Sequence, residues 1–289
     1  MACTINSNTN KVKNKKEEKV VGVKPVMDTK DDIQSKNVWN EDTYEAWVER
    51  FGKPYEAAER LKINPSVKLY PILQYFGDVK DKKILNLMGS NGIKAVALAL
   101  LGAKTAVIDI SHGNAKYAKE LAAEAGVDIR YIISDVLTIP KEEQAILYDI
   151  VFAELGIVHY FVDLKPFFDV AYSLLNSGGR FIIRDFHPIS TKLISSRGST
   201  AKIRKHKVDG DYFDTDLEKK EVSFAKYLTA GVVNEKRTVY WRRWTLGEVV
   251  TAVAQSGFTI KLLQEEPNLS SEVFDKGIPK TYTIVADKL

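Results

Sequence analysis

Cysteine is almost absent from this sequence. The 289 residues contain a single cysteine, Cys3, which excludes an internal disulfide and a cysteine-based zinc site. Because disulfides mark oxidising compartments, we expect a cytoplasmic protein. Long apolar runs are missing as well. No stretch approaches the roughly 20 residues that span a bilayer, and the N-terminus lacks the apolar core of a signal peptide, so no contact with a membrane is expected.

Most of the chain also lacks a surplus of charge of one sign. The net charge is +4, and residues 1–37 hold eight lysines against five acidic residues, so the remainder is almost neutral. A nucleic-acid surface needs a clustered basic face, so nucleic acid is an unlikely partner. The Lys-, Asn- and Ser-rich segment 1–37 is predicted to form a disordered basic tail.

The most informative stretch is residues 83–109. An apolar run ends at Leu87, the turn Gly89–Gly92 follows, and apolar residues then recur at helical spacing from Ile93 before a second β-branched run ends at Asp109. This is the pattern of one βαβ unit. A glycine turn before a helix lets a ligand approach the backbone. An acid after the second strand can accept hydrogen bonds from the hydroxyl groups of a ribose. The pattern predicts a nucleoside site.

Strands and helices continue to alternate after this unit. Further strands are predicted at 129–133, 148–154 and 180–184, with helices between them. Such alternation predicts an α/β fold with a doubly wound, mostly parallel sheet. Because parallel strands end at one edge, titratable side chains should gather there. They are Asp109, Asp135, Glu154, His159, Asp185 and His187.

Two further segments flank this core. Residues 38–82 carry aromatics at helical spacing and are predicted to form an N-terminal helical cap, which packs on the sheet or, alternatively, lines a substrate pocket with Tyr44. Residues 189–243 contain alternating patterns at 221–227 and 238–244, typical of a small hairpin or lid. The aromatic side chains of this insertion are expected near a substrate.

The ordered set of motifs resembles a class I S-adenosylmethionine-dependent methyltransferase of the small-molecule type. The resemblance rests on the turn after Leu87, on Asp109, on Ser134-Asp135-Val136, and on YDIVFAELGIVHYF and LLNSGGRFIIRDFHP further on. It covers residues 83–188, and segment 244–289 resembles the final helix and antiparallel strand pair of that fold. It implies a Rossmann-like sheet of seven strands with S-adenosylmethionine as cofactor.

The resemblance also assigns roles to individual residues. Asn86 to Gly92 would wrap the methionine part, Asp109 would take the ribose hydroxyls, and Glu154 with Leu155 would lie beneath the methionyl group. Asn86 stands where the family usually has an acid, and Met88 and Ser90 replace two glycines. The cofactor contacts implied are Asn86, Met88, Gly89, Ser90, Gly92, Asp109, Ile110, Asp135, Val136, Glu154 and Leu155.

Candidate catalytic and substrate residues follow from position and chemistry. His159 and His187 can act as a general base because histidine titrates near neutrality, and Asp185 stands between them in the chain as a third candidate. A metal site from these three side chains lacks any close ligand spacing, so no metal is expected. The substrate contacts expected are Tyr44, Tyr160, Tyr212, Tyr240 and Trp241.

The predicted function is methyl transfer to an oxygen or nitrogen of a small-molecule acceptor. One alternative is a methyltransferase acting on RNA or protein, which the near-neutral core and the lack of an Asn-Pro-Pro-Tyr motif disfavour. Others are a nucleotide-binding oxidoreductase, disfavoured because the turn lacks the first glycine of G-x-G-x-x-G, and a catalytically silent nucleotide-binding module. The sequence indicates no particular acceptor and no oligomeric state.

Overall fold

The computed structural model describes residues 38–39, 42–197, 205–228, 238–270 and 276–289. The predicted tail at 1–37 lies outside the described residues. Within the described part, no helix combines the length and apolar character needed to cross a membrane.

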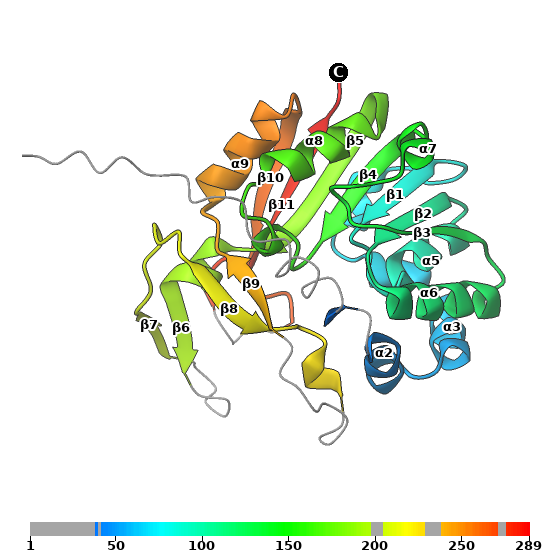
Figure 1. Ribbon diagram of the computed structural model, residues 1–289, viewed down its shortest axis with the longest axis horizontal. Helices are drawn as coiled ribbons and strands as arrows, with labels where there is room; N and C mark the ends of the chain where they lie inside the picture. Colours follow the sequence, from blue (N-terminus) through cyan, green and yellow to red (C-terminus); the bar gives the residue numbers. More distant parts are fainter. Residues whose placement is uncertain (1–37, 40–41, 198–204, 229–237, 271–275) are drawn as a thin grey trace, which may run out of the picture.

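A seven-stranded sheet forms the centre of the protein (Figure 1), in the order β10-β11-β5-β4-β1-β2-β3. β11 runs antiparallel to both of its neighbours, β10 and β5, and the other neighbouring strands of this sheet pair in parallel. The prediction of a doubly wound, mostly parallel seven-stranded sheet is therefore confirmed. The strands are β1 (Lys83–Leu87), β2 (Lys104–Asp109), β3 (Ile129–Ile133), β4 (Tyr148–Glu154), β5 (Leu175–Phe186), β10 (Thr259–Glu266) and β11 (Thr281–Asp287).

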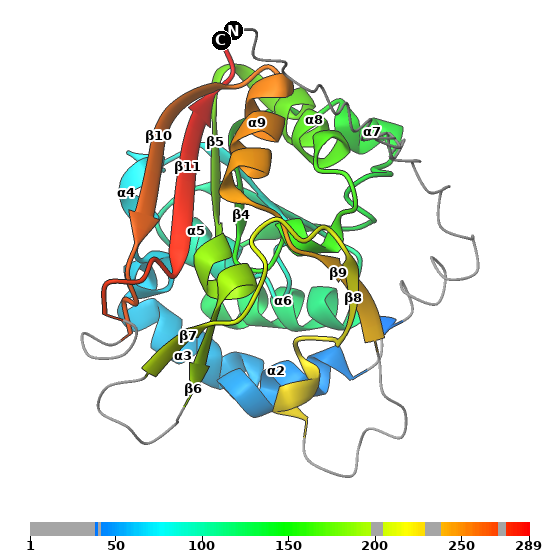
Figure 2. The same ribbon diagram turned by 90° about the vertical axis from the view of Figure 1, so that its left-hand side faces the viewer.

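Helices cover both faces of the sheet because each helix buries one apolar stripe. Side chains from α8 and α9 join one buried cluster with β4 and β5, and α3, α5 and α6 join a second cluster on the opposite face. Figures 1 and 2 show these two layers on either side of the strands. The helices are α2 (Thr43–Phe51), α3 (Pro54–Ile63), α4 (Leu73–Phe76), α5 (Ile93–Leu100), α6 (His112–Ala125), α7 (Lys141–Gln144), α8 (Lys165–Ser173) and α9 (Leu246–Gln255).

The strand order reverses between β1 and β4. β1 pairs with β2 on one side and with β4 on the other, and all three are parallel. Chain connections leave this point toward opposite faces, and in open sheets of this kind ligands bind beyond the carboxyl ends of the strands there. The loops after these two strands therefore define the candidate site.

Two hairpins lie beyond the carboxyl ends of the parallel strands (Figure 2). One pairs β6 (Ile194–Arg197) with β7 (Lys205–Val208), and the other pairs β8 (Leu217–Glu221) with β9 (Thr238–Arg242). The expected strand at 221–227 is corrected, because β8 ends at Glu221 and Ala225–Tyr227 forms the 3₁₀ turn η4. The sequence of β8, LEKKE, carries no apolar alternation that could mark it as a strand.

Candidate active site

The turn between β1 and α5 has an unusual backbone. Met88 and Ser90 both adopt left-handed conformations, with φ of 49° and 51°, which cost a non-glycine residue roughly 1–2 kcal/mol each. Neighbouring groups hold the turn in place: the Ser90 N–H donates to Asp109 Oδ2 (3.0 Å), and the Tyr131 hydroxyl donates to the Ser90 carbonyl (2.6 Å). The residues that replace glycine thus keep the backbone path of a glycine turn.

Two glycines in this turn have no room for a side chain. A Cβ atom on Gly89 would lie 2.6 Å from Asn86 Oδ1, and one on Gly92, whose φ is +68°, would lie 2.6 Å from the Cβ of Ala118. Asn86 is buried beneath the turn, and its amide donates to the carbonyls of Leu87 and Phe152 at 3.4 Å. The turn therefore packs closely over β1 and α6.

Asp109 ends β2 beside this turn. Its carboxylate accepts hydrogen bonds from the N–H groups of Ser90 and Ser111 and from the Asn114 side-chain amide, each at 3.0 Å. Burial raises the pKa of Asp109, and these donors oppose the shift because they favour the ionised form. The acid expected after the second strand is thus held rigidly at the carboxyl edge of the sheet.

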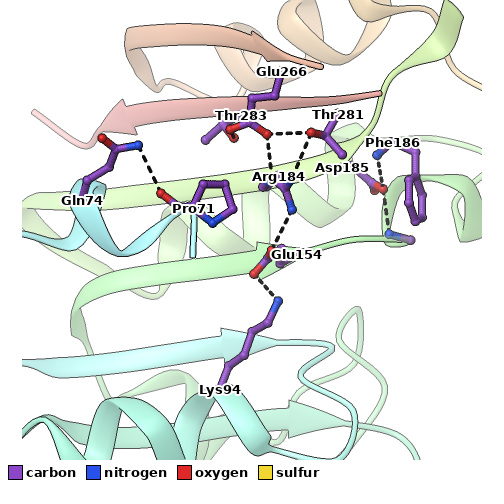
Figure 3. A network of polar contacts seen from close by, with 11 residues as sticks. Pro71, Gln74, Lys94, Glu154, Arg184, Asp185, Phe186, Glu266, Thr281 and Thr283 are labelled. Carbon is purple, nitrogen blue, oxygen red and sulfur yellow. Dashed lines mark hydrogen bonds and ion pairs between the residues drawn. The ribbon is translucent and has the colours of Figure 1, made fainter. Parts of the chain in front are cut away.

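A chain of alternating charges links α5, β4, β5 and β10 (Figure 3). Lys94, in the first turn of α5, pairs with Glu154 at the end of β4, and Glu154 accepts a bond of 3.1 Å from Arg184 on β5. The Arg184 guanidinium also donates a hydrogen bond of 2.7 Å to Glu266 on β10. Burial lowers the pKa of Lys94, and the Glu154 carboxylate opposes this shift. Two cations thus hold Glu154 at the end of β4.

Backbone N–H groups surround the carboxylate of Asp185 near the end of β5. Its carboxylate accepts four backbone hydrogen bonds of 2.7–3.0 Å, from the N–H groups of Gly156, Ile157, Val158 and Phe186. A carboxylate has about four acceptor positions, so none remains to take a proton from a substrate. Asp185 thus fixes the loop that follows β4, and the catalytic role expected for it stays a prediction.

His187 is also occupied by structural contacts. The side chain is buried, Nδ1 accepts from the Ile189 N–H (3.1 Å), and Nε2 lies 2.7 Å from Glu265 Oε1. Because Nδ1 accepts, Nε2 carries the proton and donates to Glu265. Both ring nitrogens are thus engaged, and the expected role of His187 as a base stays a prediction.

His159 has the properties that His187 lacks. It lies on the 3₁₀ turn η2 (Val158–Tyr160), and its ring contacts Trp241 of β9 with centroids 4.0 Å apart. Nε2 of His159 and Nε1 of Trp241 are both buried without a hydrogen-bond partner among the described residues. Burial lowers the pKa of His159 to about 4, so the ring is neutral at pH 7. A buried polar atom without a partner is unfavourable, which indicates that a ligand supplies one.

Aromatic side chains enclose His159. The Tyr160 ring contacts the His159 ring in a tilted arrangement, with centroids 4.2 Å apart, and it meets Trp39 edge-on at 5.3 Å. Trp39 and Phe224 extend the same cluster, which joins β9, η4 and α2 to the loop after β4. Tyr160 and Trp241, two of the predicted substrate contacts, are thus brought together with His159.

The other predicted substrate contacts lie elsewhere. The hydroxyl of Tyr44 donates to Glu120 on α6 (2.5 Å), and the hydroxyl of Tyr212 accepts from the Leu246 N–H at the start of α9 (3.2 Å). Tyr240 is exposed because alternation on β9 turns it away from the face that carries Trp241. The structure does not bring these three tyrosines to the His159 cluster.

The remaining predicted cofactor contacts lie along the carboxyl edge. Asp135 follows β3 and its Oδ1 accepts from the Leu137 N–H (2.9 Å), while Val136 is buried in the core. Ile110 directly follows β2. Leu155 adopts a left-handed conformation, with φ of 59°, immediately after β4. The loop beside Glu154 is therefore as constrained as the turn after β1.

Three residues of this region were not predicted. Trp39 and Phe224 stand in the segments interpreted as a helical cap and as a hairpin or lid, and those patterns did not mark either residue as a neighbour of His159. Lys94 did carry one, because it is the single charged residue in the α5 sequence IKAVALAL. Its partner Glu154 lies 60 positions away in the chain, which only the fold reveals.

Comparison with known proteins identifies the domain. Residues 87–183 match the family model of a methyltransferase domain. The chain therefore contains a methyltransferase domain over these residues. No curated protein matches the chain.

Solved structures share the fold of this methyltransferase. One from Listeria monocytogenes, described as an S-adenosylmethionine-dependent methyltransferase, has 20% identity and a TM-score of 0.56, covering 80% of this chain and 99% of that chain. Another such methyltransferase, from Mesorhizobium loti, has 21% identity and a TM-score of 0.56 over 76% and 97% of the two chains. Magnesium protoporphyrin IX methyltransferase from Synechocystis PCC 6803 with bound SAH has 13% identity and a TM-score of 0.54. The match covers 90% of this chain and 100% of that chain.

The residues at the carboxyl ends of β1 and β4 fit the cofactor of this methyltransferase. A Cβ atom on Gly89 would collide with the Asn86 side chain, so glycine lets the backbone of the turn lie close over β1. The Asp109 carboxylate lies beside this turn, as a nucleoside site requires. The bound cofactor supplies an electrophilic methyl group on a sulfonium.

The neutral state of His159 can be measured directly. We expect the NMR signal of its ring to titrate near pH 4 instead of near 6.5, because burial disfavours the imidazolium. As the pH falls, His159 binds a proton in the unfolded chain before it does so in the folded protein. The contribution of His159 to the free energy of unfolding is therefore lost between pH 6.5 and about 4. A His159→Phe variant assigns the signal among the four histidines. A midpoint near 6.5 would contradict the burial of this ring.

Proposed function

We propose that this methyltransferase transfers its methyl group to an oxygen or nitrogen of a small molecule bound against His159, Tyr160 and Trp241. The observation that carries the proposal is the neutral, buried His159 whose Nε2 lacks a partner among the described residues. A hydroxyl or ammonium group of an acceptor would satisfy that nitrogen. The aromatic rings of Tyr160 and Trp241, which both contact His159, favour a compact organic acceptor over a folded macromolecule.

His159 acts as the general base in this proposal. Its neutral ring accepts the proton that leaves the acceptor, and a positioned base contributes roughly 10²–10⁴-fold to a rate. The ionised Asp185 favours the protonated ring by its charge, although burial outweighs this effect in the resting enzyme. Asp185 also holds the loop that carries His159. Trp241 Nε1 is left to donate to a second polar atom of the acceptor.

The cofactor assignments stay with the residues predicted for them. Asp109 binds the ribose hydroxyls, Ile110 and Val136 flank the adenine, and Asp135 receives its amino group. The backbone from Asn86 to Gly92 surrounds the methionine part. The rigid placement of Asp109 and the left-handed turn support this arrangement, because a pre-formed site loses less entropy on binding.

The acceptor class is tested by following a radioactive methyl group. The enzyme is incubated with methyl-labelled S-adenosylmethionine and, separately, with the small-molecule filtrate, the RNA and the protein of a cell extract. We expect label to be transferred in the small-molecule fraction alone. Transfer to RNA or protein would replace the proposal by its macromolecular alternative, and no transfer in any fraction would favour a silent binding module.

The role of His159 is tested in the same assay. We expect His159→Phe to lower the rate of label transfer by about 10²-fold or more, since it removes the base and keeps an aromatic ring of similar shape. Binding of S-adenosylhomocysteine, measured by calorimetry, should be unchanged. A fall in cofactor affinity equal to the fall in rate would assign His159 to the cofactor instead.

A further inference from the structure

Lys94 occupies a position that is unfavourable for a lysine in the fold alone. It is the one charge in an otherwise apolar helix, and it lies in the first turn, where the helix dipole disfavours a cation. Its side chain is about three-quarters buried, with 24% exposed. Its partner Glu154 already has a second cation, Arg184, at 3.1 Å. Folding therefore gives little reason to place a lysine here.

The ammonium of Lys94 also has unused hydrogen-bonding capacity. Among the described residues it donates to Glu154 alone, so two of its three N–H groups are available to a ligand. Arg184, by contrast, donates to Glu154, Glu266 and Thr281 and is buried. Lys94 is thus the incompletely bonded end of the charge chain seen in Figure 3.

The pair lies at the point where the strand order reverses. Lys94 follows the turn after β1, and Glu154 ends β4, the strand that pairs with β1. Asn86 brings no charge to this place, so Glu154 supplies the negative charge and Lys94 the positive one. A cation and an anion side by side complement an amino acid, whose carboxylate and ammonium share one carbon atom.

We propose that Lys94 binds the carboxylate of the amino-acid part of S-adenosylmethionine, while Glu154 faces its ammonium. This inference rests on the proposed placement of the cofactor at the carboxyl ends of β1 and β4. Lys94 then selects for ligands that carry the amino acid over those that carry the nucleoside alone.

Two ligands separate the amino acid from the nucleoside. S-adenosylhomocysteine carries both parts, and 5′-methylthioadenosine keeps the nucleoside and the sulfur but lacks the amino acid. In calorimetry, Lys94→Met should weaken binding of S-adenosylhomocysteine by at least about tenfold, as expected for loss of a charge-assisted hydrogen bond. Binding of methylthioadenosine should change by less than about twofold, within the usual effect of a substitution that touches no ligand.

Two variants serve as controls. Lys94→Arg keeps the charge and should retain most of the preference for S-adenosylhomocysteine. Lys104→Met removes an exposed lysine that pairs with Asp81 at 4.0 Å, and it should alter neither affinity. If Lys94→Met does not fold, Lys94→Gln replaces it, since its amide can still donate to Glu154 while lacking the charge.

The outcomes distinguish this inference from the proposed cofactor site. An equal loss for both ligands in a folded Lys94 variant, or no loss for either, would overturn the role of Lys94. If the wild-type enzyme binds neither ligand, the cofactor placement itself fails. A selective loss for S-adenosylhomocysteine supports both.

Discussion

Replacing Asp109 by alanine is expected to weaken binding of S-adenosylhomocysteine by at least about tenfold. The change removes the carboxylate proposed to hold the ribose, and a charged hydrogen bond contributes roughly 1.5–3 kcal/mol, equivalent to about ten- to a hundredfold in affinity. It also leaves the N–H groups of Ser90 and Ser111 without their acceptor, which loosens the turn. Calorimetry with S-adenosylhomocysteine measures the loss.

The pattern across ligands and a matched control make this test specific. Methylthioadenosine carries the same ribose, so Asp109→Ala should weaken its binding as much, in contrast to Lys94→Met. Asp149 near the start of β4 also accepts two hydrogen bonds, from Lys83 and Asn176, at the opposite end of the parallel strands. Asp149→Ala should leave both affinities unchanged. Unchanged affinity in Asp109→Ala would show that the ribose assignment is incorrect.

The strands of the core could be predicted because their central residues are apolar and buried. β3 and β4 begin and end at the predicted residues, 129–133 and 148–154, since a continuous apolar or β-branched run between polar residues marks such a strand. The helix after Asp109 was also evident from its caps: Ser111 accepts from the Asn114 N–H at one end, and Gly126 is left-handed at the other. The order of strands across the sheet is set by tertiary packing, and only the family resemblance indicated it.

The chemistry of individual side chains could not be predicted in the same way. The sequence places His159, Asp185 and His187 after strand ends with equal weight. The structure separates them by their hydrogen bonds: Asp185 is saturated by backbone donors, His187 has both nitrogens engaged, and His159 keeps one nitrogen without a partner among the described residues. These partners lie up to 78 positions apart in the chain. Such pairings are properties of the folded chain, and local patterns do not encode them.

Replacing Asp185 by asparagine is expected to lower the free energy of unfolding by about 3 kcal/mol or more. The carboxylate accepts hydrogen bonds from four backbone N–H groups. An asparagine of the same shape offers one oxygen acceptor, and its amide nitrogen would point its own N–H donors toward two of those backbone N–H groups. Each buried donor left unsatisfied costs about 1–3 kcal/mol. Urea denaturation measures the change, with a constant slope showing that the transition remains two-state.

The exposed Asp169 provides the matched control, because its carboxylate pairs with Lys165 one helical turn away. Asp169→Asn should cost less than about 1 kcal/mol, as is usual for a surface pair. In Asp185→Asn, methyl transfer should fall more than affinity for S-adenosylhomocysteine, because the loop fixed by Asp185 carries His159 and the substrate wall. A variant that keeps wild-type stability and still loses transfer would instead place Asp185 in direct contact with the acceptor, and the saturation of its carboxylate by the backbone argues against that result.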